Sequence, residues 1–394
     1  MRYHSYLNTA KKIIETYTGA TPLAVFLKPF FARDKKYGSR DRRQIATICY
    51  HYFRLGMWAR EIDIESRICI ATFLCEQTSN DFLQAIKPEW NEKIKETLHQ
   101  KTILCGFNAE NIFPWKEEFS EGIDQLQYCE SFLQQPDLFL RIRPRKKNTV
   151  LKKIQDAGLN YTMQEADCIA FPNSSKLDGI LELDKEAVVQ DFNSQKVLDY
   201  LKQEKENMQH PITRVWDCCA ASGGKSILAF DILEGKIQLT VSDIRESILA
   251  NLNKRFARAG ISGYRSFIAD LNDKGLQLPN PSLPAGKSGF QLIICDAPCT
   301  GSGTWSRTPE QLHFFDPASI SGFANRQKKI VSTALPHLQT GGLFFYITCS
   351  VFRKENEEIT EFIKKEFHLQ LVQVEILKGF DKRADTMFVA LFKK

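Results

Sequence analysis

The stretch that decides the fold is residues 215–225, which read VWDCCAASGGK. A short apolar run ends in a carboxylate at Asp217, a glycine pair follows, and a helical pattern begins after that pair. In open α/β sheets, ligands bind beyond the carboxyl ends of the strands, where glycines let the backbone come close. The stretch therefore predicts a cofactor loop made of Cys219, Ala220, Ala221, Ser222, Gly223, Gly224 and Lys225.

Short apolar runs alternate with helical patterns from about residue 190 onward, which is typical of a doubly wound parallel sheet. We expect strands at 213–218, 237–243, 265–269, 290–296, 342–348, 369–375 and 387–392. The expected fold class is α/β, with a Rossmann-like sheet as the main domain. The interval 272–289 is rich in proline, glycine and serine and predicts a surface loop.

Three acids end consecutive predicted strands after the loop. Asp243 occupies the position where a carboxylate binds ribose hydroxyls, and Asp270 is expected at an adenine edge. Asp296 ends a further strand and completes the predicted cofactor-binding set. The loop matches neither the GxGxxG fingerprint nor the Walker A pattern, which disfavours NAD and ATP relative to S-adenosylmethionine.

Two cysteines follow predicted strands and lie among polar residues. Cys299 lies in ICDAPCTGSGT (294–304) and Cys349 in FYITCS (345–350). A thiolate can split one difficult reaction step into two easier ones by forming a covalent adduct, and a nearby acid such as Asp296 can stabilise that adduct. Spacing alone leaves open which cysteine attacks. The two thiols and Asp296 are the candidate catalytic residues.

The sequence resembles the RNA cytosine-C5 methyltransferases of the RsmB/Fmu and NOL1/NOP2/Sun type. Their loop D-x-C-A-A-P-G-G-K is similar to residues 217–225, with Ser222 in place of proline. Their D-A-P-C-[ST]-G-x-G-T is similar to residues 296–304, and their T-C-S followed by E-N-E is similar to residues 348–350 and 355–357. The loss of proline at Ser222 is expected to loosen the turn slightly.

The resemblance implies a fold, a cofactor and residue roles. It implies S-adenosylmethionine as methyl donor, Cys349 as the nucleophile, Cys299 as the helper in product release, and Asp296 at N3 of the base. DNA cytosine methyltransferases instead use a Pro-Cys motif, which would make Cys299 the nucleophile. Ribosomal RNA is the preferred substrate, because the N-terminal region is suggestive of the NusB-like domain of the ribosomal members, and transfer RNA is the alternative.

The chain is expected to divide into three parts: a helical domain over 1–135, a small α+β module over 136–190 that faces RNA, and the catalytic domain over 191–394. Helical periodicity is clearest in 6–17, 45–55 and 62–73, and the module is expected to contain strands at 138–143, 168–171 and 180–183. The predicted RNA-contacting cations are Arg141, Arg143, Arg145, Lys146 and Lys147, and a looser cluster comprises Lys35, Lys36, Arg40, Arg42 and Arg43.

The formal net charge of +6 is compatible with a polyanionic partner. Eleven cysteines without paired CxxC spacing indicate neither a disulfide framework nor a metal site. No apolar run reaches the ~18 residues of a membrane span, so we expect a soluble, cytoplasmic monomer. A catalytically inactive RNA-binding assembly factor is the competing hypothesis, and a small-molecule methyltransferase is disfavoured by the basic segment and the additional domains.

Overall fold

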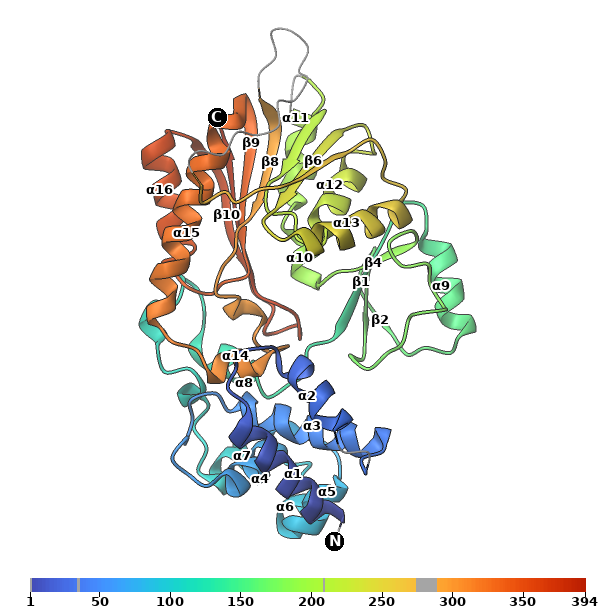
Figure 1. Cartoon of the computed structure of the whole chain (residues 1–394), viewed down its shortest axis with the longest axis vertical. Coiled ribbons are helices and arrows are strands. Elements are labelled where there is room, and N and C mark those ends of the chain that lie inside the picture. The colour runs from blue at the N-terminus through green and yellow to red at the C-terminus, as the bar shows by residue number, and fades with distance from the viewer. Residues whose placement is uncertain (1, 34–35, 208–209, 274–288) are drawn as a thin grey trace. The chain divides into compact units, whose positions relative to one another are not determined.

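The computed structural model describes residues 2–33, 36–207, 210–273 and 289–394 (Figure 1). Most of the predicted 272–289 loop, and Lys35 of the looser basic cluster, lie outside the described residues. By their internal contacts the residues form two compact units. Within the described parts of the chain, no helix combines the length and apolar character needed to cross a membrane.

The first unit is helical and comprises residues 1–119, 123–135 and 304–317. Its core gathers the apolar faces of several helices, with Ile13, Ile45, Phe53 and Phe73 fully buried. Periodic apolar residues form these faces, and Asp63 caps α4 by accepting a hydrogen bond from the Ser66 amide. The helices are α1 (Arg2–Thr16), α2 (Leu23–Ala32), α3 (Ser39–Arg54), α4 (Ile64–Cys75), α5 (Asp81–Ile86), α6 (Pro88–Glu92), α7 (Leu98–Cys105), α8 (Gln125–Ser131) and α14 (Pro309–His313), with short 3-10 turns η1 (Ala109–Ile112) and η2 (Lys116–Glu118).

The α14 segment belongs to this helical unit although it follows the Asp296–Gly303 region in sequence. The carboxylate of Glu310 accepts a hydrogen bond from the Leu23 amide at 3.0 Å. The rings of Phe53 and His313 pack edge to face with centroids 5.2 Å apart, and Phe314 packs on Tyr17. The core of the helical unit is therefore assembled from two distant parts of the chain.

The second unit contains a small antiparallel sheet in the order β2-β3-β1-β4, covered by α9. The predicted strand at 180–183 is wrong, because only isolated bridges join Asp178 to Leu181 and Leu183 to Ala187. Gly179 and Asp184 flank this segment with φ of +83° and +69°, and such left-handed positions interrupt an extended chain. The elements are β1 (Leu138–Ile142), α9 (Lys147–Asp156), β2 (Thr162–Glu165), β3 (Cys168–Phe171) and β4 (Ala187–Val189).

The main sheet of this unit has seven strands in the order β10-β11-β9-β8-β5-β6-β7. Each corresponds to a predicted strand: β5 (Arg214–Asp217), β6 (Gln238–Asp243), β7 (Arg265–Ile268), β8 (Phe290–Asp296), β9 (Leu338–Thr348), β10 (Gln370–Leu377) and β11 (Met387–Lys393). The sheet is mixed rather than wholly parallel, since β11 runs antiparallel to both β9 and β10. The expected Rossmann-like α/β fold is confirmed. The strand order reverses between β5 and β8, the place where such sheets bind ligands.

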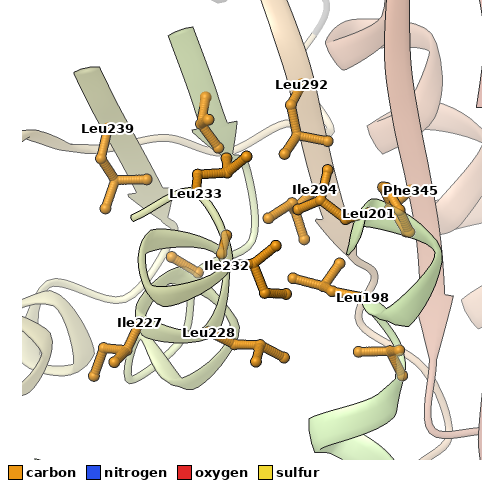
Figure 2. Close-up of a cluster of buried hydrophobic side chains, with 14 of the residues drawn as sticks. Leu198, Leu201, Ile227, Leu228, Ile232, Leu233, Leu239, Leu292, Ile294 and Phe345 are labelled. Atoms are coloured by element: carbon orange, nitrogen blue, oxygen red, sulfur yellow. The ribbon is translucent and has the colours of Figure 1, made fainter. Parts of the chain in front are cut away.

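Helices cover both faces of this sheet. Figure 1 shows α12 and α13 on one face and α15 and α16 on the other. In β8, Leu292 and Ile294 belong to one buried cluster, while Ile293 and Cys295 belong to the opposite one. Figure 2 shows the first cluster, where Ile232 of α12 lies close to Ile294. The helices are α10 (Phe192–Lys196), α11 (Asp199–Asn207), α12 (Gly224–Ile232), α13 (Glu246–Ala259), α15 (Ala318–Ala334) and α16 (Glu357–Phe367), with the 3-10 turns η3 (Ser302–Thr304) and η4 (Leu335–His337).

Candidate functional site

The predicted cofactor loop connects β5 to α12 at the carboxyl edge of the sheet. Ala221 and Gly223 both have positive φ, +45° and +84°, and the Gly223 amide donates to the Ala220 carbonyl at 2.8 Å. A Cβ on Gly223 would lie 2.6 Å from Cε1 of Phe256, so both the conformation and the packing require glycine there. The tight turn presents the N-terminal amides of α12, which have no intrahelical partners, toward the strand ends.

Ser222 stands at the position where the resemblance stated above implies proline, and Arg255 holds it. Nη1 of Arg255 donates to both the backbone carbonyl and the hydroxyl oxygen of Ser222, each at 3.0 Å. Arg255 is itself anchored by an ion pair of 2.8 Å with the buried Asp184. The expected loosening of the turn is therefore opposed by a hydrogen-bonded clamp from α13.

Asp243 and Asp270 lie at neighbouring strand ends, as the sequence predicted. Oδ2 of Asp243 accepts the Ala221 amide at 3.0 Å, and its Oδ1 accepts the amide and Nε of Arg245. Burial opposes ionisation, yet the hydrogen bonds from Arg245 outweigh it and hold the pKa of Asp243 below its ordinary value. Asp270 is exposed and accepts two hydrogen bonds from Asn272.

Lys225 at the end of the cofactor loop reaches Asp296 at the end of β8. Their Nζ and Oδ2 atoms lie 2.7 Å apart, and the lysine side chain is only 12% exposed. Burial favours the neutral amine, but the Asp296 carboxylate and the Cys349 sulfur outweigh it, so the pKa of Lys225 lies above its ordinary value. Lys225 of the cofactor loop thus interacts with Asp296 of one cysteine segment and Cys349 of the other, and these charged groups form one electrostatic centre.

Cys299 and Cys349 come together at this centre. Their sulfur atoms lie 3.4 Å apart, and both residues are partly exposed. The segments that carry them are joined by backbone hydrogen bonds from Ala297 to Ile347 and from Gly303 to Cys349, each 2.8 Å long. The hydrogen bond to Cys349, together with burial, raises the pKa of the Cys299 thiol well above its ordinary value. Ionisation of Cys299 is therefore disfavoured.

Glu355 is a fully buried carboxylate behind the two cysteines. It accepts hydrogen bonds from the Thr300 amide at 2.9 Å, the Thr300 hydroxyl at 2.6 Å, the Ser350 hydroxyl, and Nε2 of Gln327 at 3.0 Å. Burial raises its pKa, and these donors oppose that shift. Thr300 follows Cys299 and Ser350 follows Cys349, so one side chain fixes both segments. The sequence placed Glu355 in a motif without giving it a role.

Asn356 supports the Cys349 segment from the same turn. Its side-chain amide donates to the Ser350 carbonyl at 2.9 Å and accepts from the Thr348 hydroxyl at 2.6 Å. The two residues that flank Cys349 are thus fixed by a single buried amide.

Comparison with known proteins decides the family to which this arrangement belongs. Residues 201–390, which include the cofactor loop, both cysteines and Glu355, match the family described as 16S rRNA methyltransferase RsmB/F. This part of the chain belongs to the RsmB/F methyltransferase family. Methyltransferases of this family use S-adenosylmethionine.

A curated relative of this methyltransferase domain is the ribosomal RNA small subunit methyltransferase B of Enterobacter sp.. It is 27% identical over 283 residues, which cover 70% of this chain and 60% of the relative. The chain therefore spans about 60% of that protein's length.

Solved structures share the fold at low sequence identity. The crystal structure of PH0851 is similar to this one, with a TM-score of 0.69 and 17% sequence identity. The match covers 99% of this chain and 98% of the PH0851 chain. NSun6 from Pyrococcus horikoshii, crystallised with the S-adenosylmethionine analogue SFG, has a TM-score of 0.57 and 14% identity. That match covers 73% of this chain and 96% of the NSun6 chain. These similarities support the Rossmann-like fold of the methyltransferase domain.

The methyltransferase domain also contains a cluster of three thiols that sequence spacing did not indicate. The sulfur atoms of Cys218, Cys219 and Cys295 lie within 4.8 Å of one another, where β5 and β8 run side by side. Hydrogen bonds from Cys218 and Cys219 lower the pKa of Cys295. Two of these residues are adjacent in sequence and the third is on a neighbouring strand, so the cluster depends on strand pairing.

Asp217 lies beneath the cofactor loop of the methyltransferase and is fully buried. Its Oδ2 accepts the Ser226 hydroxyl at 2.6 Å, whereas its Oδ1 has no partner among the described residues. Burial raises the pKa of Asp217 to about 7. The carboxyl group is therefore able to change charge close to neutral pH.

The predicted RNA-contacting cations divide into two groups. Arg141 and Arg143 are turned inward, where each forms an ion pair of 2.7 Å with Asp231 of α12. Arg143 also donates to the carbonyls of Asp184 and Ala259. The solvent-accessible cations are Arg145, Lys146 and Lys147. A direct phosphate contact by Arg141 or Arg143 would require these ion pairs to break.

Proposed function

We propose that the chain transfers the methyl group of S-adenosylmethionine to C5 of a cytosine in RNA, with ribosomal RNA as the preferred substrate. The observation that carries this proposal is the convergence of two partly exposed thiols beside the Lys225–Asp296 ion pair. A methyl transfer to oxygen or nitrogen needs no thiol nucleophile. Addition of a thiolate to C6, by contrast, is what makes the weakly nucleophilic C5 reactive.

Cys349 is the proposed nucleophile. Ionisation of Cys299 is disfavoured, so we assign it as the donor to the Cys349 sulfur, where a hydrogen bond stabilises the charge that develops on the nucleophile. The Lys225 ammonium is attracted to the same sulfur. The Cys349 thiolate bonds to C6, C5 attacks the sulfonium methyl, and S-adenosylhomocysteine leaves. We assign Asp296 to N3 of the base, where hydrogen bonding stabilises the adduct.

Cys299 is the proposed helper in product release. Once the Cys349 sulfur is bonded to C6, it carries no charge and accepts no strong hydrogen bond from Cys299. The hydrogen bond and the charge interaction with Cys349 then no longer raise the pKa of Cys299, so the Cys299 thiolate forms more readily. That thiolate takes the proton from C5, the C5–C6 double bond re-forms, and the Cys349 thiolate is eliminated.

The nucleic-acid partner is inferred from chemistry and charge. The target base must leave its stack for the thiol to reach C6, which favours a single-stranded loop or a flipped nucleotide. Arg145, Lys146 and Lys147, in the small α+β module, are the proposed phosphate contacts. Transfer RNA is the alternative substrate.

The decisive experiment incubates purified protein, methyl-labelled S-adenosylmethionine and total RNA from cells lacking the gene. We expect label in 5-methylcytosine, and bisulfite sequencing of RNA from cells with and without the gene identifies the position. Cofactor binding without turnover on any RNA would favour the inactive assembly factor, and label in a small molecule would overturn the RNA assignment.

A further inference from the structure

We propose that the helical unit carries its own binding site for single-stranded RNA, in a groove lined by α1, α2 and the described residues Arg33, Lys36 and Tyr37. The groove encloses about 1040 Å³, which is at the upper limit of small-molecule sites. All the residues that line it lie within the helical unit. The proposal rests on RNA being the substrate class, as proposed above, and adds a second place where RNA is held.

One wall of the groove is aromatic. Phe26 and Phe30, one turn apart on α2, are partly exposed, and their rings stack with centroids 6.2 Å apart and an interplanar angle of 29°. Phe26 is held from behind by the ring of Tyr17 at 5.1 Å. Such supported ring faces bind nucleic-acid bases by stacking, without preference for sequence.

The opposite wall is a polar stripe along α1. His4, Asn8, Lys12 and Thr16 recur every four residues and are exposed toward the groove. The stripe spans about 18 Å of helix, which matches roughly five stacked nucleotides at about 3.4 Å each. Amide, imidazole and hydroxyl groups at this spacing suit the hydrogen-bonding edges of unpaired bases.

The charge of the groove favours a polyanion. Lys12, Arg33 and Lys36 contribute cations to the lining, and no acidic side chain is among the described residues that line it. Lys36 also lies over the Tyr37 ring, whose hydroxyl bonds to Thr9 at 2.9 Å and closes the floor. Stacking faces combined with cations are the two components of single-strand binding, and an acidic peptide would require only the cations.

The test uses the full-length protein and a fluorescent oligouridylate of about 12 nucleotides, which contains no cytosine to methylate. Binding is measured by anisotropy at several salt concentrations. The double variant Lys12→Glu and Arg33→Glu should bind about tenfold or more weakly, with a salt slope smaller by about 1.4. The control Lys28→Glu reverses an exposed charge on α2 that does not line the groove, and it should have a much smaller effect.

Stacking is tested at Phe30, because Leu keeps the apolar packing and Trp keeps a ring face. We expect Phe30→Leu to weaken binding about fivefold or more and Phe30→Trp to restore it. A groove for an acidic peptide would tolerate Leu, so equal binding by the two variants would overturn the proposal. The same measurements in a protein lacking the charges of Arg145, Lys146 and Lys147 remove the contribution of that second cluster.

The outcomes separate this proposal from the proposed enzyme activity. Unchanged oligouridylate binding in the double variant, or no binding by the unmodified protein, would overturn the proposal that the groove binds RNA. Neither result would bear on methyl transfer, which is measured separately. Groove-dependent binding without methyl transfer would instead overturn the enzyme assignment alone.

Discussion

The sulfur atoms of Cys299 and Cys349 lie 3.4 Å apart although fifty residues separate them in sequence. They meet because β8 and β9 are adjacent parallel strands, whose carboxyl ends open onto the same edge of the sheet. Two thiolates at this distance would repel each other strongly, so ionisation of both thiols at once is disfavoured. The same separation permits the two thiols to act in sequence on one base.

The first prediction separates the two thiols. In Cys299→Ala the adduct should form but resolve slowly, so a protein–RNA species stable to denaturing gel electrophoresis should accumulate. Cys349→Ala should give no such band, because the bond to C6 cannot form, and its affinity for S-adenosylmethionine should be nearly unchanged. The double variant serves as the control and should also give no band.

Reversal of these results would exchange the two roles. A band in Cys349→Ala that vanishes in Cys299→Ala would make Cys299 the nucleophile, as in the DNA enzymes, and would leave the reaction class intact. No adduct in any variant, with an RNA that is verifiably methylated, would count against covalent catalysis.

The second prediction concerns Glu355→Gln. The amide replaces a carboxylate that accepts four hydrogen bonds, and its NH2 group faces donors, so the Thr300 and Ser350 segments should lose their fixed positions. We expect turnover to fall tenfold or more, with slower adduct formation and an affinity for S-adenosylmethionine within about twofold of the original. The matched control is Glu358→Gln, an exposed acid three residues later, in the first turn of α16. Equal losses in turnover and cofactor affinity would show a general structural defect instead.

The third prediction concerns Asp243→Ala. Removal of this carboxylate leaves the Ala221 amide without its partner and removes the proposed ribose contact. Affinity for S-adenosylmethionine should weaken by about 1–3 kcal/mol by calorimetry. Glu246→Ala, an exposed acid in the first turn of α13, is the control and should bind normally. Unchanged affinity in Asp243→Ala would place the ribose elsewhere.

The fourth prediction concerns the exposed cations after β1. Joint replacement of Arg145, Lys146 and Lys147 by Ala should weaken binding of substrate RNA and flatten its salt dependence, because fewer counterions are released. Lys152→Ala, on the α9 helix that Lys147 begins, provides an exposed control. An unaltered salt slope would mean that these cations are solvated surface charges that do not contact phosphate.

The fifth prediction is a pH dependence of stability. The pKa of Asp217 is raised to about 7 in the folded protein, so between about pH 4 and pH 7 the folded state holds a proton that the unfolded chain has lost. The free energy of unfolding should therefore fall as pH rises through this window, by at most about 1.4 kcal/mol per pH unit, and level off above it. Urea unfolding of Asp217→Asn should lack this contribution. Identical pH profiles for the two proteins would contradict a protonated Asp217.

The sequence was most informative about the strands and their ends. Buried strands such as β8 are continuous apolar runs, and Asp296 marks the end of that run. The strand and the position of its end could therefore be predicted from the order of residues alone. The apolar run of β11 does not show its direction, because such a run is the same read either way, so the direction has to come from the length of the connection. The connection from β10 to β11 is too short for a parallel crossover, which forces the antiparallel arrangement.

The site was less predictable where it depends on distant partners. Arg141 resembled a phosphate ligand in sequence, but the position of Asp231 on α12, ninety residues away, turns it into a structural ion pair. The central role of Glu355 was equally hidden, because a carboxylate that will be buried is identical in sequence to one that will be exposed. Strand ends are local features, whereas burial and pairing of charges are properties of the assembled unit.

Residues 304–317 complete the core of the helical unit, and this has a consequence for synthesis on the ribosome. When residue 135 emerges, the helices already formed lack Glu310 and His313, which come roughly 170 residues later. At typical elongation rates the nascent helical part waits on the order of 10 to 30 s with an unfilled apolar face. The N-terminal part of this chain therefore completes its core only after four of the seven strands of the Rossmann-like sheet have been translated, and a gene truncated at residue 135 encodes an incomplete core.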